Sequence, residues 1–186
     1  MIIGICGVAR CGKDTTYNIF NKILTNQGKT CERFAFADQI KEELKPLLEK
    51  NFNINPFECD DETKEKIRPL MVAYGTYLAR SIDKDHWIKK LSKKIESEPN
   101  TDYKFITDVR YENEINFLRS NFKNSYVIYV EREGFNPINE EEKENCPILK
   151  SRADYIIQWP SFKKPELKEG EPYVQKIINE ELKDRQ

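Results

Sequence analysis

The chain has 186 residues, a length that suits one domain with a sizeable hydrophobic core. Its 31 lysines and arginines nearly balance its 32 aspartates and glutamates, and the net charge is −1. This balance excludes a chain-wide basic surface for gripping nucleic acid, so no nucleic-acid polymer is expected as a partner. No apolar run approaches the ~18 residues of a membrane span, so no membrane partner is expected.

The number and spacing of the cysteines indicate the cellular compartment in which the protein acts. There are five of them, none in CxxC spacing, beside a single histidine. An odd count without this spacing argues against a disulfide framework, and the scarcity of histidine argues against a zinc site. We therefore expect reduced thiols and a cytoplasmic protein.

The N-terminal segment predicts a strand, a tight loop and a helix. Ile2 to Cys6 is a short apolar run that ends at a glycine, as buried strands do. Gly7 to Gly12 is a loop bounded by glycines. From Lys13 onward apolar residues recur at helical spacing, and Gly28 is placed to end that helix.

The next segment predicts one strand and then several helices. Arg33 to Phe36 is the second predicted strand, and Asp38 is placed to cap the following helix. Residues 51–61 look irregular, and residues 63–82 look helical. We interpret the whole helical region 37–95 as an insertion that binds a substrate.

The C-terminal half predicts two strands separated by a helix and followed by a polar segment. The strands are Tyr103–Thr107, closed by Asp108, and Tyr126–Val130, with a helix over residues 112–121 between them. Residues 133–151 are acidic and contain two prolines, which predicts a lid-like loop.

The last part predicts a fifth strand over Ala153–Gln158, a proline-broken segment over 160–172 and a final helix over Tyr173–Leu182. Strands that alternate with helices favour an α/β fold. We therefore expect residues 1–186 to form a single three-layer α/β/α domain with about five parallel strands, a helical insertion and a lid.

The segment from Gly7 to Thr15 fits the phosphate-binding pattern GxxxxGK of P-loop proteins. Its glycines let successive backbone N–H groups face an anion, and the helix that follows adds its positive end. Most chance occurrences of this pattern do not lie between a predicted strand and a predicted helix, as this one does. ATP is expected to contact Gly7, Arg10, Cys11, Gly12, Lys13, Asp14 and Thr15. Cys11 is expected in the loop for its small size, and the nearby Lys13 can also raise the reactivity of its thiol.

The loop departs from the usual pattern at one position. Asp14 stands where a Ser or Thr normally binds Mg²⁺, and Thr15 follows it. A carboxylate can hold Mg²⁺ directly or through water, or it can simply stabilise the helix start. The sequence leaves both roles open.

A second motif lies at the end of the third predicted strand. Asp108 falls at the carboxyl edge of the sheet, where open α/β sheets bind ligands. It can hold Mg²⁺ through water, orient the acceptor or merely cap the next helix. Arg110 can clamp a phosphate. The expected metal ligands are Asp14, Thr15 and Asp108.

Phosphoryl transfer requires cations from several directions, because its transition state spreads negative charge over several oxygens. Each cation alone is more often a surface charge than a ligand, but several lie at predicted strand ends and loops. These candidates are Arg10, Lys41, Arg68, Arg80, Arg110 and Arg132.

Four stretches together resemble the phage and viral deoxynucleoside monophosphate (dNMP) kinases. They are GVARCGKDTT, FAFADQIKEEL, YGTYLARSIDKDHW and FITDVRYENEINFLR, and the resemblance runs from Met1 to Arg132. It implies a P-loop nucleotide-kinase core, ATP and Mg²⁺ as cofactors, transfer of phosphate from ATP to a dNMP, and a viral enzyme acting in the host cytoplasm.

The resemblance also assigns roles. Lys13, Arg110 and Arg132 would be catalytic. The nucleotide substrate would contact Arg10, Asp38, Ile40, Lys41, Arg68, Tyr74, Arg80, Asp108 and Arg110. Beyond Arg132 the resemblance fades.

Two alternatives stay open. The same fold serves phosphomevalonate kinase of the animal type, which also has a GKD loop, and dephospho-coenzyme A kinase. The second alternative is a non-catalytic module that only binds nucleotide, because Asp14 replaces the usual Ser or Thr of the loop. The preferred base and the oligomeric state, including a homodimer, are also left open.

Overall fold

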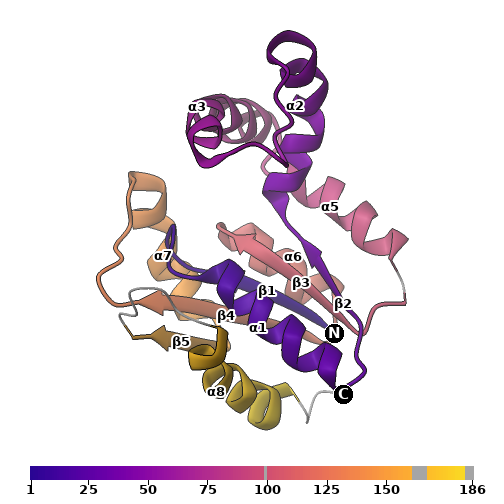
Figure 1. Ribbon diagram of the computed structural model, residues 1–186, viewed down its shortest axis with the longest axis vertical. Helices are drawn as coiled ribbons and strands as arrows, with labels where there is room; N and C mark the ends of the chain where they lie inside the picture. The colour runs from indigo at the N-terminus through magenta and orange to yellow at the C-terminus, as the bar shows by residue number, and fades with distance from the viewer. Residues whose placement is uncertain (99, 161–166, 183–186) are drawn as a thin grey trace. The chain divides into compact units, whose positions relative to one another are not determined.

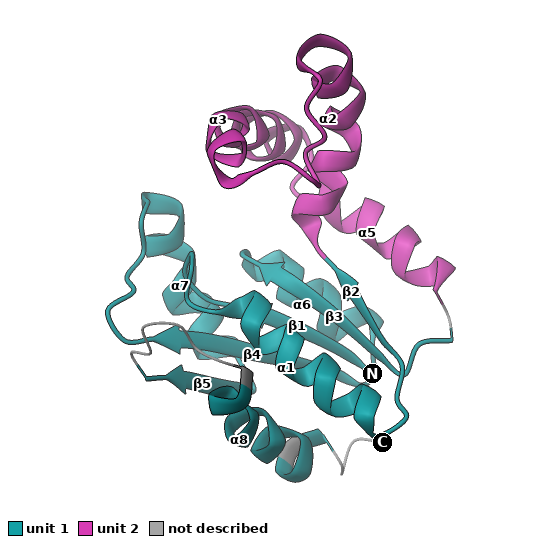
Figure 2. Ribbon diagram, viewed as in Figure 1, with its two compact units in different colours: residues 1–34, 99–186 teal, residues 35–98 magenta. Residues whose placement is uncertain are grey.

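A computed structural model describes residues 1–98, 100–160 and 167–182 of the chain. The chain divides into two compact units (Figure 2). The core unit comprises residues 1–34 and 99–186, and the insertion unit comprises residues 35–98. The insertion unit covers the region in which an insertion over 37–95 is predicted.

The core unit is built on a parallel sheet of five strands in the order β2-β3-β1-β4-β5 (Figure 1). Every residue of β1 is buried, as a central strand covered on both faces requires. The predicted α/β architecture is therefore confirmed. The strands are β1 (Ile2–Cys6), β2 (Cys31–Phe34), β3 (Tyr103–Val109), β4 (Ser125–Arg132) and β5 (Tyr155–Trp159).

Helices cover both faces of this sheet, which gives the three layers (Figure 1). On one face lie α1 (Lys13–Asn26) and α8 (Leu167–Ile177), which continues as the π-helical segment η2 (Ile178–Leu182). On the other lie α6 (Glu112–Asn121) and α7 (Glu140–Arg152). Within the described part of the chain, no helix is both long and apolar enough to cross a membrane.

The boundary between β2 and the next helix differs from the prediction by two residues. Parallel pairing with β3 ends at Phe34, which lies opposite Ile106. Ala35 is extended and occupies the N-cap position, so the helix begins at Phe36. Asp38 therefore lies in the first turn of this helix, and its predicted capping role is wrong.

The lid-like loop predicted over 133–151 is irregular only as far as Asn139, and α7 begins at the next residue, Glu140. The Asn139 side chain caps this helix by accepting a 2.8 Å hydrogen bond from the N–H of Glu142. Three glutamates in the first turn stabilise the helix further, because their negative charges lie at the positive end of its dipole. These contacts outweigh Pro147, which lies inside the helix. The prediction of a loop over 140–151 is therefore wrong.

The last helix also begins earlier than predicted. Helix α8 starts at Leu167 and contains Pro172, whereas the sequence predicts a start at Tyr173. Of the proline-broken segment predicted over 160–172, residues 161–166 lie outside the described residues.

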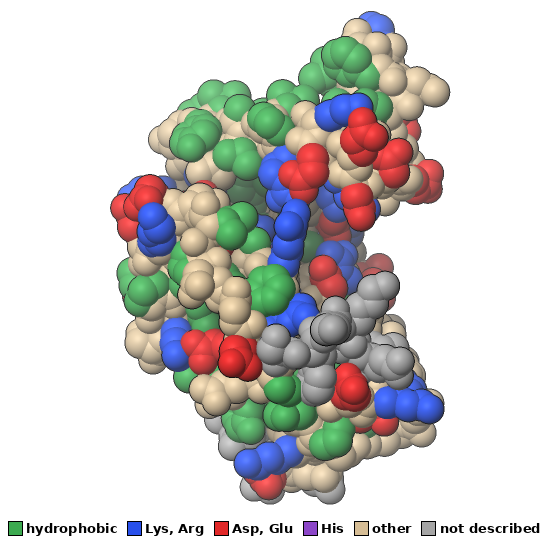
Figure 3. All heavy atoms as spheres, turned by 60° about the vertical axis from the view of Figure 1, so that its left-hand side comes forward, with side chains coloured by type: hydrophobic (Ala, Val, Ile, Leu, Met, Phe, Trp, Pro, Cys, Tyr) green, Lys and Arg blue, Asp and Glu red, His purple; other side chains and the backbone are tan. Residues whose placement is uncertain are grey.

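The insertion unit is helical and has its own small core, in which Leu44, Leu48 and Ile67 are buried. Residues 61–82 are helical throughout, and Pro69 lies four residues before the π-helical segment. Apolar side chains also gather on the exposed surface of this unit (Figure 3). Its elements are α2 (Phe36–Phe52), α3 (Asp61–Val72), the π-helical segment η1 (Ala73–Ala79), α4 (Arg80–Ile82) and α5 (His86–Ser97).

Substitution of Phe105 in β3 tests how the core unit is packed. Phe105 is fully buried, and its ring centroid lies 5.4 Å from those of Tyr17 and Phe20 on α1. Phe105→Ala should lower the free energy of unfolding by about 3–5 kcal/mol, measured by urea denaturation. The control Phe52→Ala removes a ring that is 65% exposed and should cost far less. Equal costs would contradict this packing.

Candidate active site

The loop from Gly7 to Gly12 joins β1 to α1 at the carboxyl edge of the sheet. Gly7 and Gly12 have φ angles of 138° and 105°, which side chains rarely adopt. A Cβ atom on Gly7 would also lie 2.3 Å from the carbonyl oxygen of Val130. Both glycines of the motif are therefore needed for the shape of the loop. Arg10 lies at the tip with a φ of 62° and an exposed side chain.

Lys13 folds over this loop. Its Nζ donates hydrogen bonds of 2.9 Å to the carbonyl oxygen of Gly7 and 2.7 Å to that of Val8. Lys13 is also the first residue of α1, whose first-turn N–H groups have no partner within the helix. An ammonium group and a helix start thus lie at one loop, an arrangement suited to phosphate.

The predicted metal ligands are oxygen donors at the ends of two elements. Asp14 is exposed and Thr15 is half-buried in the first turn of α1, whereas Asp108 is half-buried near the end of β3. Hard cations such as Mg²⁺ prefer oxygen donors of this kind. Among the described residues, no cluster of three His, Cys, Asp or Glu side chains could hold a metal unaided. This donor set fits a Mg²⁺ ion that is held partly by phosphate oxygens.

Asp108 belongs to an irregularity in β3 that sequence reasoning missed. Gly4 pairs with Ile106 and Cys6 pairs with Val109, so Thr107 and Asp108 together face one residue of β1. Such a bulge changes the direction of the side chains it contains. The Thr107 side chain is 2% exposed, and its hydroxyl has no hydrogen-bond partner in the described part of the chain.

Glu114 shapes the turn that carries Arg110. Its Oε2 accepts hydrogen bonds of 2.7 Å from the N–H of Arg110 and 3.1 Å from that of Tyr111. Tyr111 is the N-cap of α6, so the alternative that Asp108 caps this helix is wrong. The Arg110 side chain is exposed at this edge of the sheet. Glu114 is itself 2% exposed and was missed by sequence reasoning.

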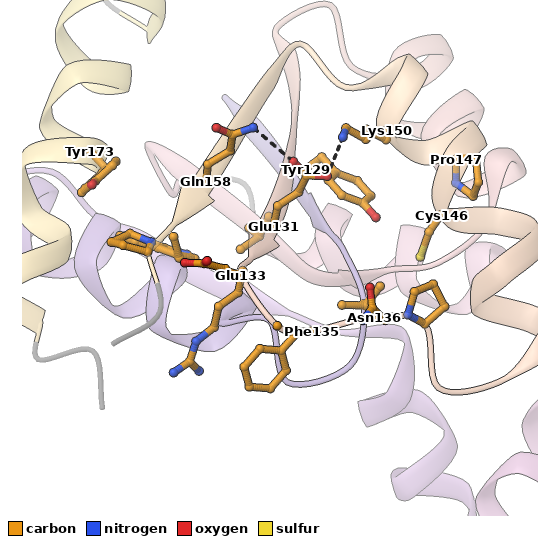
Figure 4. Close-up of a pocket in the computed structure, with 17 residues that line it drawn as sticks. Tyr129, Glu131, Glu133, Phe135, Asn136, Cys146, Pro147, Lys150, Gln158 and Tyr173 are labelled. Carbon is orange, nitrogen blue, oxygen red and sulfur yellow. Dashed lines mark hydrogen bonds and ion pairs between the residues drawn. The ribbon is translucent and has the colours of Figure 1, made fainter. Parts of the chain in front are cut away.

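Arg132, the last residue of β4, borders a cavity of about 700 Å³ (Figure 4). Its guanidinium carbon lies 4.6 Å from the centroid of the Phe135 ring. Trp159 and Tyr173 also line the cavity, with ring centroids 5.3 Å apart. The Trp159 indole N–H donates a 3.2 Å hydrogen bond to the hydroxyl of Thr16, which connects the cavity wall to α1.

The polar part of the cavity contains an ion pair. Lys150 of α7 lies 2.5 Å from the carboxylate of Glu131, and Gln158 of β5 donates a 3.4 Å hydrogen bond to the other oxygen (Figure 4). Polar groups and aromatic rings thus line one cavity in the core unit, a combination typical of small-molecule sites.

In the insertion unit, α2 brings two of the predicted residues together. The Lys41 ammonium lies 3.2 Å from the Asp38 carboxylate and 5.2 Å from the centroid of the Phe57 ring. Phe57, which is 41% exposed, was missed because it lies in the irregular stretch before α3. Ile40 packs where a Cβ atom of Gly75 would otherwise lie.

The other predicted residues of the insertion unit have separate surroundings. Arg68 is exposed on α3 and donates two hydrogen bonds, of 2.8 and 3.0 Å, to Glu65. The Tyr74 hydroxyl donates a hydrogen bond to Glu43. Arg80 is half-buried at the start of α4. Arg68 is therefore not part of the Asp38–Lys41 pair.

The surroundings of Cys11 suit the role expected from its small size better than a reactive thiol. Cys11 is fully buried, and this burial raises the pKa of its thiol. The nearby Lys13 ammonium lowers the pKa by less than burial raises it. The small Cys11 side chain packs against Gly7, where a Cβ atom would lie 2.8 Å from its sulfur.

Comparison with solved structures shows the fold. The shikimate kinase from Acinetobacter baumannii in complex with shikimate is 13% identical, with a TM-score of 0.51 over 98% of this chain and 93% of that chain. The dephospho-CoA kinase from Campylobacter jejuni is 18% identical, with a TM-score of 0.50 over 100% of this chain and 98% of that chain. No curated protein sequence matches the chain.

A model of the phosphomevalonate kinase family matches residues 5–124, which is more than half of the chain. The matched region starts in β1 and includes the loop, the whole insertion unit and the motif with Asp108 and Arg110. The chain has the fold of P-loop kinases, and it belongs to the phosphomevalonate kinase family.

Proposed function

We propose that this P-loop kinase transfers the γ-phosphoryl group of ATP to a deoxynucleoside monophosphate, giving a dNDP and ADP. The loop over Gly7–Gly12 with Lys13 folded across it is the observation that carries the use of ATP as donor. Phosphoryl transfer depends mainly on positioning and on charge neutralisation, and this loop offers both to a nucleotide phosphate.

The cavity beside the loop supports the donor half of the proposal. Its volume of about 700 Å³ falls within the usual range for ligand sites. Phe135 and Trp159 offer flat apolar walls to the base of ATP, and Arg132 supplies a cation at the same wall. Val8 of the phosphate-binding loop also lines this cavity. A base bound there would therefore lie beside the loop that binds its phosphates.

The candidate residues of the core unit would have different roles in phosphoryl transfer. Lys13 and the N-terminus of α1 would neutralise the phosphates of ATP, and Arg110 and Arg132 would stabilise charge on the transferring group. Asp14, Thr15 and Asp108 would hold Mg²⁺, which supplies further neutralisation when bound. Glu114 would hold the turn that carries Arg110.

The insertion unit would supply the acceptor site. Lys41 offers a charge to the acceptor phosphate, and the exposed Phe57 ring beside it offers a face on which a base can stack. Asp38 holds the Lys41 ammonium in place. Arg68, Tyr74 and Arg80, which have separate surroundings in the structure, would join this site when the acceptor binds, and Arg68 would exchange its Glu65 partner for the phosphate.

A second candidate acceptor is phosphomevalonate, which the family match favours. This acceptor has a phosphate and a carboxylate but no base. Cations of the insertion unit would suit both anionic groups, whereas Phe57 would have no base to stack on. Loss of the Phe57 ring should therefore weaken the binding of a dNMP but not the binding of phosphomevalonate.

A coupled assay of ADP release with Mg²⁺-ATP and each acceptor tests the proposal. We expect release to depend on one or more dNMPs, and Phe57→Ala to raise the KM for that dNMP about tenfold through lost stacking. Phe52→Ala, which removes another exposed ring of the same unit, is the control. Saturation by phosphomevalonate and by no dNMP would replace the first acceptor with the second.

Lys13→Ala tests the donor half separately. Loss of the ammonium removes charge neutralisation in the transition state, so kcat should fall by about a hundredfold or more. The circular dichroism spectrum should stay unchanged, because the side chain bonds to loop carbonyls at a half-buried site. A variant with wild-type turnover would contradict the assigned role.

A further inference from the structure

Glu142 of α7 is a buried carboxylate that bonds directly to the phosphate-binding loop. Its residue is 9% exposed, and its Oε1 accepts a 3.0 Å hydrogen bond from the N–H of Ala9. Its Oε2 accepts a 3.2 Å hydrogen bond from the N–H of Ile138. One side chain therefore joins two loops that lie more than a hundred residues apart in the sequence.

The position of Glu142 is itself fixed by its surroundings. It lies in the first turn of α7, where its own N–H is bonded to the capping side chain of Asn139. The positive end of the helix dipole favours a carboxylate at this position. Tyr111 of the Arg110 turn donates a 2.5 Å hydrogen bond to the neighbouring Glu141, which ties the start of α7 to α6.

These bonds affect which loop groups can receive a phosphate. A carboxylate bonded to Ala9 occupies that N–H and places negative charge beside it. Bound phosphates would therefore be directed to the N–H groups that follow, toward Lys13 and the start of α1. The bond to Ile138 also holds the end of the 133–139 segment, which contributes Phe135 and Pro137 to the cavity.

We propose that Glu142 is a positioning residue for ATP, which fixes the tip of the phosphate-binding loop and the 133–139 segment in one arrangement. This inference rests on the proposed use of ATP and adds a residue that acts without touching the reacting atoms. Glu142 would stay bonded to Ala9 while ATP is bound, because both of its oxygens and its helix turn are already held.

Glu142→Gln tests the inference, since the amide keeps one accepting oxygen and turns an NH₂ group toward the other N–H. We expect the dissociation constant of Mg²⁺-ADP, measured by isothermal titration calorimetry, to rise about tenfold. The KM for ATP should rise by a similar factor, with the KM for the acceptor unchanged. A purely structural role would instead lower the active fraction and leave both KM values alone.

Glu140→Gln is the matched control. Glu140 lies in the same helical turn, but its side chain is 80% exposed and pairs with Lys143. This variant removes the same charge and should bind Mg²⁺-ADP as the wild type does. If Glu142→Gln does not fold, Glu142→Asp withdraws the carboxylate by one methylene and should also weaken Mg²⁺-ADP.

Unchanged or tighter Mg²⁺-ADP binding by the folded Glu142 variant would overturn the inference, and tighter binding would show that Glu142 competes with phosphate. An equal loss of affinity in Glu140→Gln would overturn it too, because the effect would then follow from charge alone. If the wild type binds no Mg²⁺-ADP, the proposed function fails, and this inference fails with it.

Discussion

The close approach of Gly7 to the carbonyl of Val130 is the constraint on which the site depends. It leaves no room for a side chain, and it sets where the chain leaves β1 at the centre of the sheet. From this point the loop can turn back so that Lys13 reaches the carbonyls of Gly7 and Val8. Buried carboxylates then hold neighbouring segments at the same edge: Glu142 holds the loop tip, and Glu114 holds the Arg110 turn.

The elements that local patterns specify could be predicted from the sequence. Residues 2–6 and 112–121 form a strand and a helix with the predicted bounds, because apolar spacing and flanking loop residues define them. The helix over 140–151 could not be predicted, because the two prolines and the charges of the segment 133–151 indicated a loop. This helix is stabilised by the Asn139 cap and by glutamates at the dipole, and Leu149 and Cys146 are buried.

The candidate site could likewise be predicted only in part. The GxxxxGK spacing identified Gly7, Gly12 and Lys13, because each has a role that one residue type fulfils. Glu142 and Glu114 were missed, since a buried carboxylate that bonds backbone N–H groups has no spacing in the sequence that marks it. Glu142 lies 133 residues from Ala9, and the three-dimensional fold alone brings them together.

Amide hydrogen exchange of the loop, followed by NMR with and without Mg²⁺-ADP, tests the central claim most directly. That claim is that the loop N–H groups bind nucleotide phosphate. The account predicts that Mg²⁺-ADP slows exchange at Gly12, Lys13 and Asp14, while exchange at Ala9 stays as slow as it is in the free protein. Exchange at these three residues that is indifferent to saturating Mg²⁺-ADP would contradict the account.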